Sequence, residues 1–404
     1  MERLQAFKFE LRPNGGQQRN LCRFAGSCRY VYNKALAIQI KNHEDGNKYI
    51  SYADMCKNLT EWRNDPATPW LKDSPVHPLQ QALQDLDRAF KNFFAGRAKF
   101  PRYKKKGSGG GFRYPDQKQF KLDQGNSRIF LPKLGWIRYR KSRDVLGTLC
   151  SFTVSQSGGK WFVSILTKRE VEQPVHQATS IIGIDVGITR FATLSDGTHI
   201  EPINTFKKHE KKLAKYQRRM ANKVKFSKNW KKAKAKVQKV QTNISNARRD
   251  FLQKTSTTIS KNHAVVCVEA LQVRNMSKSA SGTTETPGRM VAAKSGLNKA
   301  ILDQGWGMFF LMLQYKMLWL GGYFVAVPPQ NTSRTCPACG HVSGDNRKTQ
   351  AKFLCVSCGY ENNADLVGAI NVRERGHRSL ACGEPVQSGR SVKQEPTEVS
   401  QAAA

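Results

Sequence analysis

The stretch SIIGIDVGITRFATLSDG, residues 180–197, determines the fold that we expect for the second half of the chain. It reads as a strand, a turn and a second strand, and along the first strand successive side chains point to opposite faces. Asp185 shares its face with Gly183 and Gly187, whereas the other face is apolar: Ile182, Ile184, Val186 and Ile188. Since glycine has no side chain, we expect the space beside Asp185 to admit a bulky anion and a hydrated metal ion.

Asp185 alone does not identify a site. Aspartate is disfavoured at the centre of a strand unless the protein uses it. The alternative is an edge strand on which the carboxylate faces solvent. Similar strand–Asp–Gly patterns also occur in sugar and acetate kinases, but the chain has no Gly-rich phosphate loop to support a phosphotransferase.

A second carboxylate, Glu269, ends the apolar run KNHAVVCVEAL at residues 261–271. The density of valine predicts a strand buried on both faces, as at the centre of a sheet. An ionised glutamate at the end of such a strand is costly unless it is paired or binds metal. A salt bridge with one of the many Lys or Arg residues is the alternative.

A third carboxylate, Asp365, belongs to a helix that Asn362 or Asn363 can cap. Aspartate at a helix N-terminus is favourable with the helix dipole in any case, which is the alternative to a functional role.

If the three carboxylates converge, they could hold Mg²⁺, which prefers oxygen ligands. A pair of such ions about 4 Å apart can activate water and stabilise the leaving oxygen of a phosphodiester.

The segment TCPACGHVSGDNRKTQAKFLCVSC, residues 335–358, contains two Cys-x-x-Cys pairs. Their spacing is typical of a structural zinc site, and four thiolates suit tetrahedral zinc: Cys336, Cys339, Cys355 and Cys358. With all four positions filled, this metal should hold shape and not catalyse. Four unligated thiols in a turn-rich segment are the alternative.

Charge points to a polyanionic partner. The 404 residues include 67 Lys and Arg against 30 Asp and Glu, a formal net charge of +37. Nucleic acid is favoured, because phosphate contacts supply most sequence-independent affinity. A membrane is the alternative, but no run approaches the roughly 20 apolar residues of a spanning helix. The N-terminus has no apolar signal core, so we expect a cytoplasmic protein, nucleoid-associated when bound to DNA, whose cysteines are reduced.

Apolar periodicity predicts most of the remaining elements. Phe7, Phe9 and Leu11 indicate a strand, and a hairpin is expected at residues 157–159 within a β-rich region. We also predict a loop around residues 98–114, a short helix beginning near Asp365, and no regular structure from Gly376 onward. Further helices and loops are expected as follows: helices at 23–40, 79–94 and 306–320, a long basic helical stretch at 207–254 with one apolar face, and a polar loop at 274–299.

These motifs occur in the order seen in TnpB proteins, the transposon-encoded nucleases related to type V CRISPR effectors, and the chain resembles that family over roughly residues 5 to 385. The motifs are KFPRYKKK, LPKLGWIRYR, GIDVGI, VVCVEAL, GLNKAILDQGWGMF, TSRTCPACG and NADLVGAINV. The resemblance implies an α/β multidomain protein: an RNase H-like RuvC nuclease domain with an inserted zinc ribbon, and an N-terminal wedge β-barrel interrupted by a helical recognition domain. The implied boundaries are 1–15 and 115–175 for the barrel, 16–114 for the helical domain, 179–329 and 360–376 for RuvC, 330–359 for the ribbon, and 377–404 for a disordered tail.

The resemblance also implies an activity, RNA-guided cutting of DNA beside a short flanking motif. Asp185, Glu269 and Asp365 match the catalytic carboxylates of the family, which use Mg²⁺. The implied partners are a non-coding guide RNA transcribed from the transposon end and a double-stranded DNA target. The cysteines match the family's zinc ribbon.

Several alternatives stay open. Some relatives derived from TnpB have lost carboxylates and act as RNA-guided DNA binders that repress transcription, although all three remain here. A transposase that transfers strands would need a signature that we do not find. The candidate nucleic-acid contacts are Arg102, Tyr103, Lys104, Lys105 and Lys106. Tyr103 could stack on a base. The alternative is that this run is a solvated basic loop. The basic stretch at 207–254 is likewise a channel wall or a charged face, and loop 274–299 is a candidate lid over Asp185.

Overall fold

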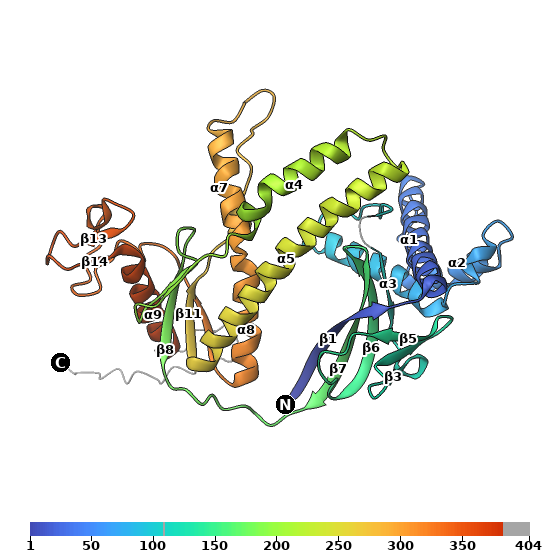
Figure 1. The fold of residues 1–404 in the computed structure, drawn as a ribbon, viewed down its shortest axis with the longest axis horizontal. Helices are drawn as coiled ribbons and strands as arrows, with labels where there is room; N and C mark the ends of the chain where they lie inside the picture. Colours follow the sequence, from blue (N-terminus) through green and yellow to red (C-terminus); the bar gives the residue numbers. More distant parts are fainter. Residues whose placement is uncertain (108–109, 383–404) are drawn as a thin grey trace, which may run out of the picture. The chain divides into compact units, whose positions relative to one another are not determined.

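The computed structural model describes residues 1–107 and 110–382. The chain forms two compact units, which divide between Glu172 and Gln173 (Figure 1). None of the described helices is both long and apolar enough to cross a membrane.

The first unit is built on an antiparallel sheet with strand order β2-β6-β7-β1-β5-β4-β3. The strands are β1 (Glu2–Arg12), β2 (Gly111–Tyr114), β3 (Lys121–Asp123), β4 (Arg128–Leu131), β5 (Gly135–Tyr139), β6 (Thr148–Ser157) and β7 (Lys160–Glu170). The predicted hairpin is confirmed: Gly158 and Gly159 both have positive φ, as a two-residue turn between β6 and β7 requires. Among the strands that the structure describes, no pairing joins β2 to β3, so the strand order is open between these two strands.

Three helices are inserted between β1 and β2: α1 (Gly15–Glu44), α2 (Tyr52–Asn64) and α3 (Val76–Phe94), with short 3₁₀ turns at Pro69–Leu71 (η1) and Gln117–Gln119 (η2). A capping box starts α1, because Asn14 and Gln17 each accept a hydrogen bond from the other's backbone N–H. Alternation in β1 is confirmed, since Phe7, Phe9 and Leu11 are all buried.

The helical insert is shorter than predicted. Residues 111–114 belong to the sheet as β2, and not to the helical domain that we expected to reach residue 114. The reason is packing: Phe112 contacts Phe24 of α1, with ring centroids 6.0 Å apart, and Tyr114 is fully buried.

The second unit contains a five-stranded sheet with the order β10-β9-β8-β11-β12. Its strands are β8 (Ile181–Val186), β9 (Ala192–Leu194), β10 (His199–Ile200), β11 (Val265–Glu269) and β12 (Tyr323–Val327). β8 runs antiparallel to β9 and parallel to β11, which is parallel to β12. β11 therefore lies inside the sheet with Val265–Val268 buried, as its apolar run predicts.

Helices cover both faces of this sheet. On one face α5 (Lys228–Asn262) and α8 (Trp306–Leu320) bury Ile182, Ile184 and Val266. The opposite face packs against α9 (Ala364–Ala381), where Cys267 and Val325 contact the helix (Figure 1). The bounds of α8 are those predicted, and Gly321 ends it in the left-handed conformation.

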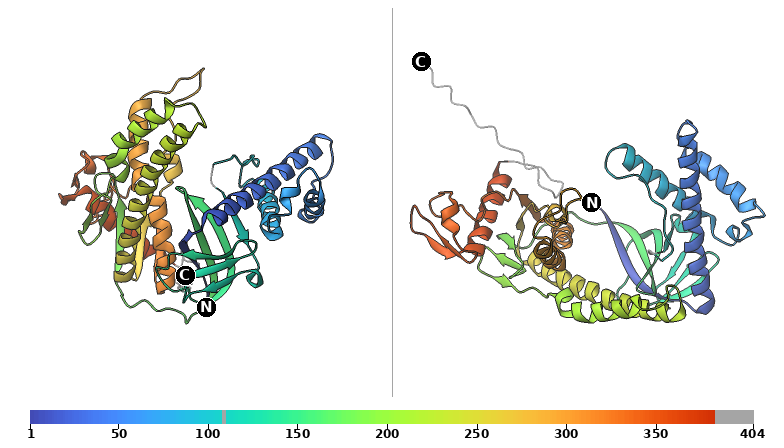
Figure 2. Two further views of the ribbon diagram at one scale, coloured as in Figure 1. Left: turned by 45° about the vertical axis from the view of Figure 1, so that its right-hand side comes forward. Right: turned by 90° about the horizontal axis from the view of Figure 1, so that it is seen from above.

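The basic stretch 207–254 is helical, as predicted, but it is divided into two helices. It consists of α4 (Thr205–Ala221) and α5, which lie side by side (Figure 2). Ser227 caps the second helix, because its hydroxyl oxygen accepts a hydrogen bond from the N–H of Trp230. The sequence does not mark this helix boundary clearly, because the turn contains neither Gly nor Pro. The predicted apolar face is confirmed, because Val237, Val240 and Ile244 of α5 pack on Leu213 of α4.

Two further expectations are corrected. The polar loop 274–299 contains the end of α6 (Val273–Met276) and the first half of α7 (Val291–Gln304), where Ala and Leu favour helix despite the polar composition. Residues 377–381 of the expected tail extend α9, and Leu380 packs against the sheet. The rest of that tail, from residue 383, lies outside the described residues.

The helix α9 lies unusually close to the sheet, because glycines stand at the contact points. A Cβ on Gly183 of β8 would lie 2.1 Å from the carbonyl oxygen of Ala369, and one on Gly376 would lie 2.2 Å from Sγ of Cys267. The expectation that Gly183 leaves room for a metal ion is therefore wrong, since the backbone of α9 fills that space.

Gly376→Ala is expected to destabilise the fold by about 2 kcal/mol, because the added methyl overlaps a buried side chain. Gly296→Ala is the matched control, since Gly296 is also helical but nothing lies within 4 Å of its added Cβ. That control should stabilise by about 0.5 kcal/mol through helix propensity. Urea denaturation measures both, and equal effects would contradict the close packing of α9.

Candidate functional site

Two of the candidate carboxylates lie on adjacent strands at the same level. The parallel register pairs Val268 with Ile184, so Glu269 and Asp185 come next, on strands about 4.8 Å apart. Both side chains belong to the α9 face, since the residues before them belong to the opposite core. The carboxyl ends of β8 and β11 thus present two carboxylates together.

The third carboxylate, Asp365, stands in the first turn of α9. Asn363 caps this helix, because its Oδ1 accepts from the N–H groups of Asp365 at 3.0 Å and Leu366 at 3.4 Å. One turn further on, a Cβ on Gly368 would lie 2.9 Å from Oδ2 of Asp185. The missing side chain lets Asp185 approach α9 and share the space beside Asp365.

The three carboxylates influence one another electrostatically. Burial, followed by the negative charges of Glu269 and Asp365, raises the pKa of Asp185 to about 8, while Arg347 opposes the shift. Burial also raises the pKa of Glu269, and the hydroxyl of Thr332, which donates to its Oε1, opposes that shift. A cluster of this kind favours protons or cations.

The carboxylate oxygens of Asp185, Glu269 and Asp365 do not form a compact set of metal ligands. Among the described residues, the cysteine cluster alone groups three or more potential metal ligands within 4.8 Å of one another. Within the described part of the chain, the three carboxylates do not form such a group with one another.

Arg347 is a member of this site that the sequence did not reveal. It ends the 3₁₀ turn η3 (Gly344–Arg347), and its Nη2 lies 3.5 Å from Oδ1 of Asp365. The same nitrogen donates to the carbonyl of Gln350 at 2.9 Å. No local pattern marks this arginine, because it is one basic residue in a polar segment of a very basic chain.

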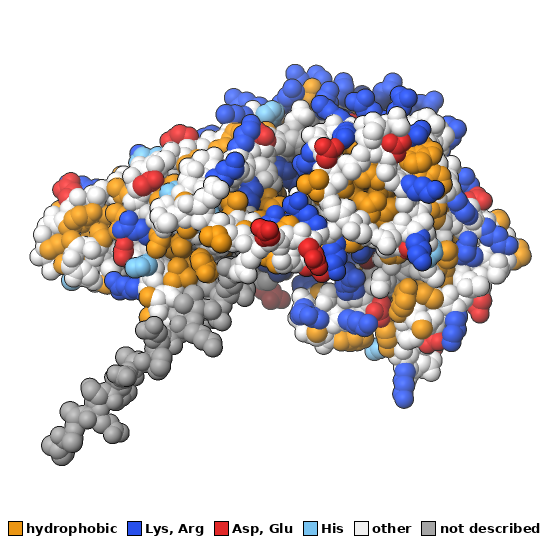
Figure 3. Space-filling model, turned by 90° about the horizontal axis from the view of Figure 1, so that it is seen from below, with side chains coloured by type: hydrophobic (Ala, Val, Ile, Leu, Met, Phe, Trp, Pro, Cys, Tyr) orange, Lys and Arg blue, Asp and Glu red, His pale blue; other side chains and the backbone are white. Residues whose placement is uncertain are grey.

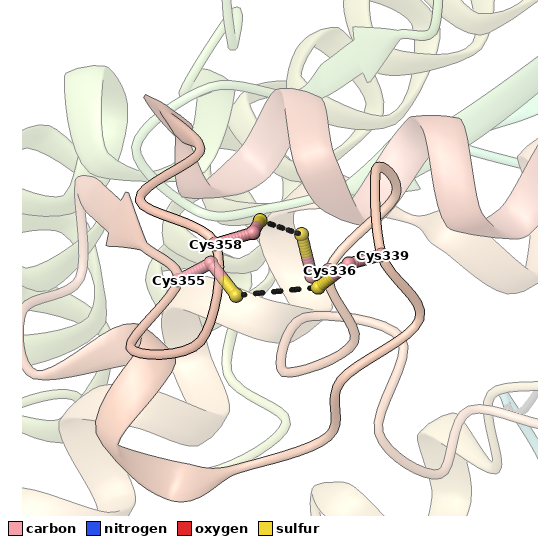
Figure 4. Close-up of side chains that lie close together, drawn as sticks. All are labelled: Cys336, Cys339, Cys355 and Cys358. Carbon is pink, nitrogen blue, oxygen red and sulfur yellow. Dashed lines mark hydrogen bonds between the residues drawn. The ribbon is translucent and has the colours of Figure 1, made fainter.

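The four predicted cysteines converge (Figure 4). The Sγ atoms of Cys336 and Cys358 are 3.6 Å apart, as are those of Cys339 and Cys355. These distances are too long for a disulfide, which has an S–S bond of about 2.05 Å. They are close to the edge of a zinc–thiolate tetrahedron, about 3.8 Å for Zn–S bonds of about 2.3 Å.

Each cysteine pair is held by a tight turn. The N–H of Gly340 donates to the carbonyl of Cys336, and the N–H of Gly359 to that of Cys355. Both glycines have positive φ, 77° and 75°. Although burial opposes it, hydrogen bonds from the backbone N–H groups of Cys358 and Ser357 lower the pKa of Cys355 to about 6. Although the backbone N–H of Tyr360 opposes it, hydrogen bonds with the other thiols and burial raise the pKa of Cys358 to about 12, so the thiols share protons unequally.

The cysteine cluster is joined to the helix that carries Asp365. The hairpin strands β13 (Lys352–Leu354) and β14 (Glu361–Asn363) lead into α9. Phe353 is fully buried with Cys336 and Cys355 against Ala364 and Val367 of the helix. The cluster therefore fixes the first turn of α9.

A buried asparagine joins the two cysteine turns. Nδ2 of Asn346 donates to the carbonyls of Arg334 and His341, and its Oδ1 accepts from the N–H of Val356. Asn371 of α9 ties the approaching chain to the helix through the carbonyls of Thr332 and Thr335.

The candidate nucleic-acid contacts at residues 102–106 lie on the surface of the first unit, and Tyr103 is half exposed. Lys104 already has protein partners. Its ammonium lies 4.0 Å from the ring centroid of Tyr32 and 3.9 Å from a carboxylate oxygen of Asp85, and Asn33 holds its backbone. Lys104 therefore serves packing as well as charge.

Three family models match the chain. Residues 164–280 match one described as "Probable transposase", and residues 306–372 match "Cas12f1-like, TNB domain". Residues 1–48 match a model described as "Helix-turn-helix domain", although the structure there has the strand β1 followed by the single helix α1.

Relatives cover the whole chain. It is 58% identical over 404 residues to the "Putative RNA-guided DNA endonuclease InsQ" of Escherichia coli K12, covering 100% of both chains. It is 34% identical to a "Putative RNA-guided DNA endonuclease" of Streptomyces pristinaespiralis, covering 97% of this chain and 96% of that one. Among solved structures, a Cas12f1–sgRNA–target DNA complex matches with 14% identity and a TM-score of 0.32, over 92% of this chain and 99% of that one. The chain belongs to the TnpB family, as its motifs indicated.

Cys355→Ser is expected to lower the zinc content from about one ion per chain to a small fraction of that, because a four-thiolate site loses a ligand. The yield of folded protein should fall as well, since the cluster holds the start of α9. Elemental analysis of the purified chain gives the zinc content. Cys382→Ser is the control, because Cys382 is exposed and lies outside the cluster; equal zinc in both variants would remove the zinc assignment.

Asp185→Asn is expected to stabilise the protein at pH 7 without added Mg²⁺. The folded-state pKa of about 8 lies above the unfolded value of about 3.9, so the stability that the Asp185 proton provides is complete below about pH 4 and is lost as the pH rises through 8. Asparagine carries no charge at any pH. The gain in unfolding free energy should therefore grow from pH 4 to 8 and reach at least about 1.4 kcal/mol, the equivalent of one pKa unit.

Denaturation curves at several pH values without chelator measure this gain. Asp250→Asn is the control, because Asp250 is an exposed residue paired with Lys254. A gain that is independent of pH, or the same for both variants, would contradict the electrostatic coupling of the cluster.

Proposed function

We propose that this chain is an RNA-guided DNA endonuclease of a transposable element that hydrolyses phosphodiesters with Mg²⁺ at Asp185, Glu269 and Asp365. The observation that carries the proposal is the register of β8 and β11, which sets two carboxylates side by side next to the first turn of α9. The names of the full-length relatives in E. coli and S. pristinaespiralis support the same activity.

The order and directions of the strands support an RNase H-like nuclease domain of the RuvC type. A three-strand antiparallel segment, β10-β9-β8, continues into the parallel strands β11 and β12. The carboxylates stand at the carboxyl ends of β8 and β11, the edge at which α/β sheets place their ligands. We assign the sheet of the first unit to the wedge domain and its helices to the recognition domain.

The carboxylate cluster fits hard cations. Its oxygen ligands suit Mg²⁺. Burial raises the pKa of both Asp185 and Glu269, and for Asp185 the charges of Glu269 and Asp365 add to the shift, so a bound cation would stabilise the ionised carboxylates. When bound, Mg²⁺ would activate water and neutralise charge on the phosphate. The four thiolates would hold one structural zinc ion, with no open position for substrate.

The side chains around the cluster have separate tasks. Thr332 donates to Glu269 and fixes its orientation, while Asn363 fixes the turn that presents Asp365. Arg347 lies beside Asp365, and three of its N–H donors do not point to Asp365 or Gln350. When a cation takes the place of Arg347 at the Asp365 carboxylate, the guanidinium can donate to a phosphate oxygen. The ribbon thus contributes a cation to the nuclease site.

Sequence choice is left to base pairing between a guide RNA and the target strand, while the protein contacts backbones through shape and charge. The net charge of +37 suits a chain that covers many phosphates. We propose that the RNA comes from the transposon end, that Arg102 to Lys106 contact nucleic acid, and that the protein works in the cytoplasm on the nucleoid.

Asp185→Ala is expected to lower the rate of DNA cleavage by about a hundredfold or more, because a metal ligand is lost. RNA and DNA binding should remain, because the binding surfaces are intact. The chain is co-expressed with the DNA flanking its gene, and the RNA that co-purifies is sequenced. The complex is then tested with Mg²⁺ on plasmids that carry a guide-matched target beside randomised flanks.

Asp250→Ala is the matched control and should cut like the wild type. Cutting by Asp185→Ala would overturn the assignment of the site. Specific RNA and DNA binding without cutting by the wild type would identify a guided binder that represses transcription, and no enriched RNA would overturn the guided activity altogether.

A further inference from the structure

The turn between α4 and α5 lies within a long stretch without negative charge. From Lys211 to Arg249 the sequence contains no Asp or Glu. The flanking acids are already paired, Glu210 with Lys299 and Asp250 with Lys254. Lys and Arg side chains form a dense band along the upper edge of the space-filling view, where these helices lie (Figure 3).

A hollow of 530 Å³ lies at this end of the helix pair. Tyr216 and Arg219 of α4 line it from one side, and Lys232 and Lys236 of α5 from the other, with Lys223 of the turn between them. All four cations are exposed, and within the described residues none of them forms an ion pair with a carboxylate. The hollow therefore concentrates positive charge around an aromatic ring.

The same turn exposes a strained aromatic residue. Phe226 is 66% exposed and has φ of 71°, a conformation that is unfavourable for a bulky side chain. Its ring meets Trp230 edge-on at 5.5 Å, and the ammonium groups of Lys225 and Lys234 lie over the two rings. Phenylalanine at this position is neither buried nor in a relaxed backbone conformation, and a partner that contacts its exposed ring would account for it.

The surface needs a partner that offers both negative charge and a flat apolar face. Nucleic acid offers both, since phosphates match the lysines and bases stack on aromatic rings. Structured RNA presents unpaired bases in loops, bulges and ends, whereas duplex DNA keeps its bases stacked. We propose that the α4–α5 turn docks the RNA partner, with an unpaired base on Phe226 and the adjoining phosphates in the hollow. This inference rests on the proposed function, because it assumes an RNA partner.

The first test separates a binding role of Phe226 from a structural one. Asparagine tolerates the positive φ, so Phe226→Asn should keep or raise the melting temperature while weakening binding of the co-purified RNA about tenfold. Phe226→Tyr keeps a ring and should bind RNA like the wild type. Both are measured on the full chain by filter binding and thermal melting. Wild-type affinity in Phe226→Asn, or a loss of affinity that follows a fall in melting temperature, would overturn the inference.

The second test counts phosphates in the hollow. Replacing Lys223, Lys232 and Lys236 with Gln should make the slope of log affinity against log salt shallower by about 2, because each contact to a single strand contributes about 0.7. The charge-matched control replaces Lys118, Lys121 and Lys261 with Gln, three exposed residues that lie outside both the helical insert and the hollow. Equal changes in slope for the two triple variants would show a general charge effect and overturn the site.

The third test identifies the occupant. A photo-crosslinking benzoylphenylalanine at position 226 of the assembled complex should label the RNA. Labelling of the DNA strand instead would overturn the choice of RNA. A wild type that binds no RNA would remove the proposed function and this inference together, whereas guided cutting that is unaffected by all of these variants would overturn the inference alone.

Discussion

The close contact of α9 with the sheet is the constraint on which the rest of the second unit depends. It exists because Gly183, Gly368 and Gly376 have no side chains where helix and sheet approach most closely. A side chain at these positions would push α9 away from the sheet, and Asp365 would then stand further from Asp185 and Glu269. The carboxylate cluster is therefore a product of packing as much as of the carboxylates themselves.

The ribbon stabilises this arrangement in two ways. Its cysteines and Phe353 form a small core with the first turn of α9, and this core fixes the position of Asp365. It also supplies Arg347, a positive charge beside three carboxylates that repel one another. A module built around four converging cysteines thus affects the geometry and the electrostatics of the carboxylate cluster. Because Arg347 and the cysteines belong to one small fold, loss of the structural metal would disturb both contributions together.

Acidic and basic residues are distributed unevenly along the chain. Most acidic residues are already engaged, either in the carboxylate cluster or in ion pairs such as Glu210 with Lys299, which leaves long surfaces purely basic. Basic surfaces repel one another, so a chain with this composition is better stabilised with a polyanion bound than alone. The turn between α4 and α5 adds exposed aromatic rings to such a surface, and this combination distinguishes a binding site from a merely solvated face.

What the sequence determined by itself is local. Alternation placed Asp185 opposite the apolar face of β8, and the density of valine placed β11 inside the sheet. The spacing of four cysteines predicted their cluster, and a helix cap was recognisable at Asn362 or Asn363. These features depend on residues within a few positions of each other, and the conformational preferences that produce them are short-range. The tertiary structure alone decided that α9 fills the space at Gly183, that Arg347 reaches Asp365, that the basic stretch folds back on itself at Phe226, and that α9 continues beyond residue 376. Each of these depends on contact with a segment far away in the chain, and no local pattern records which segment that will be.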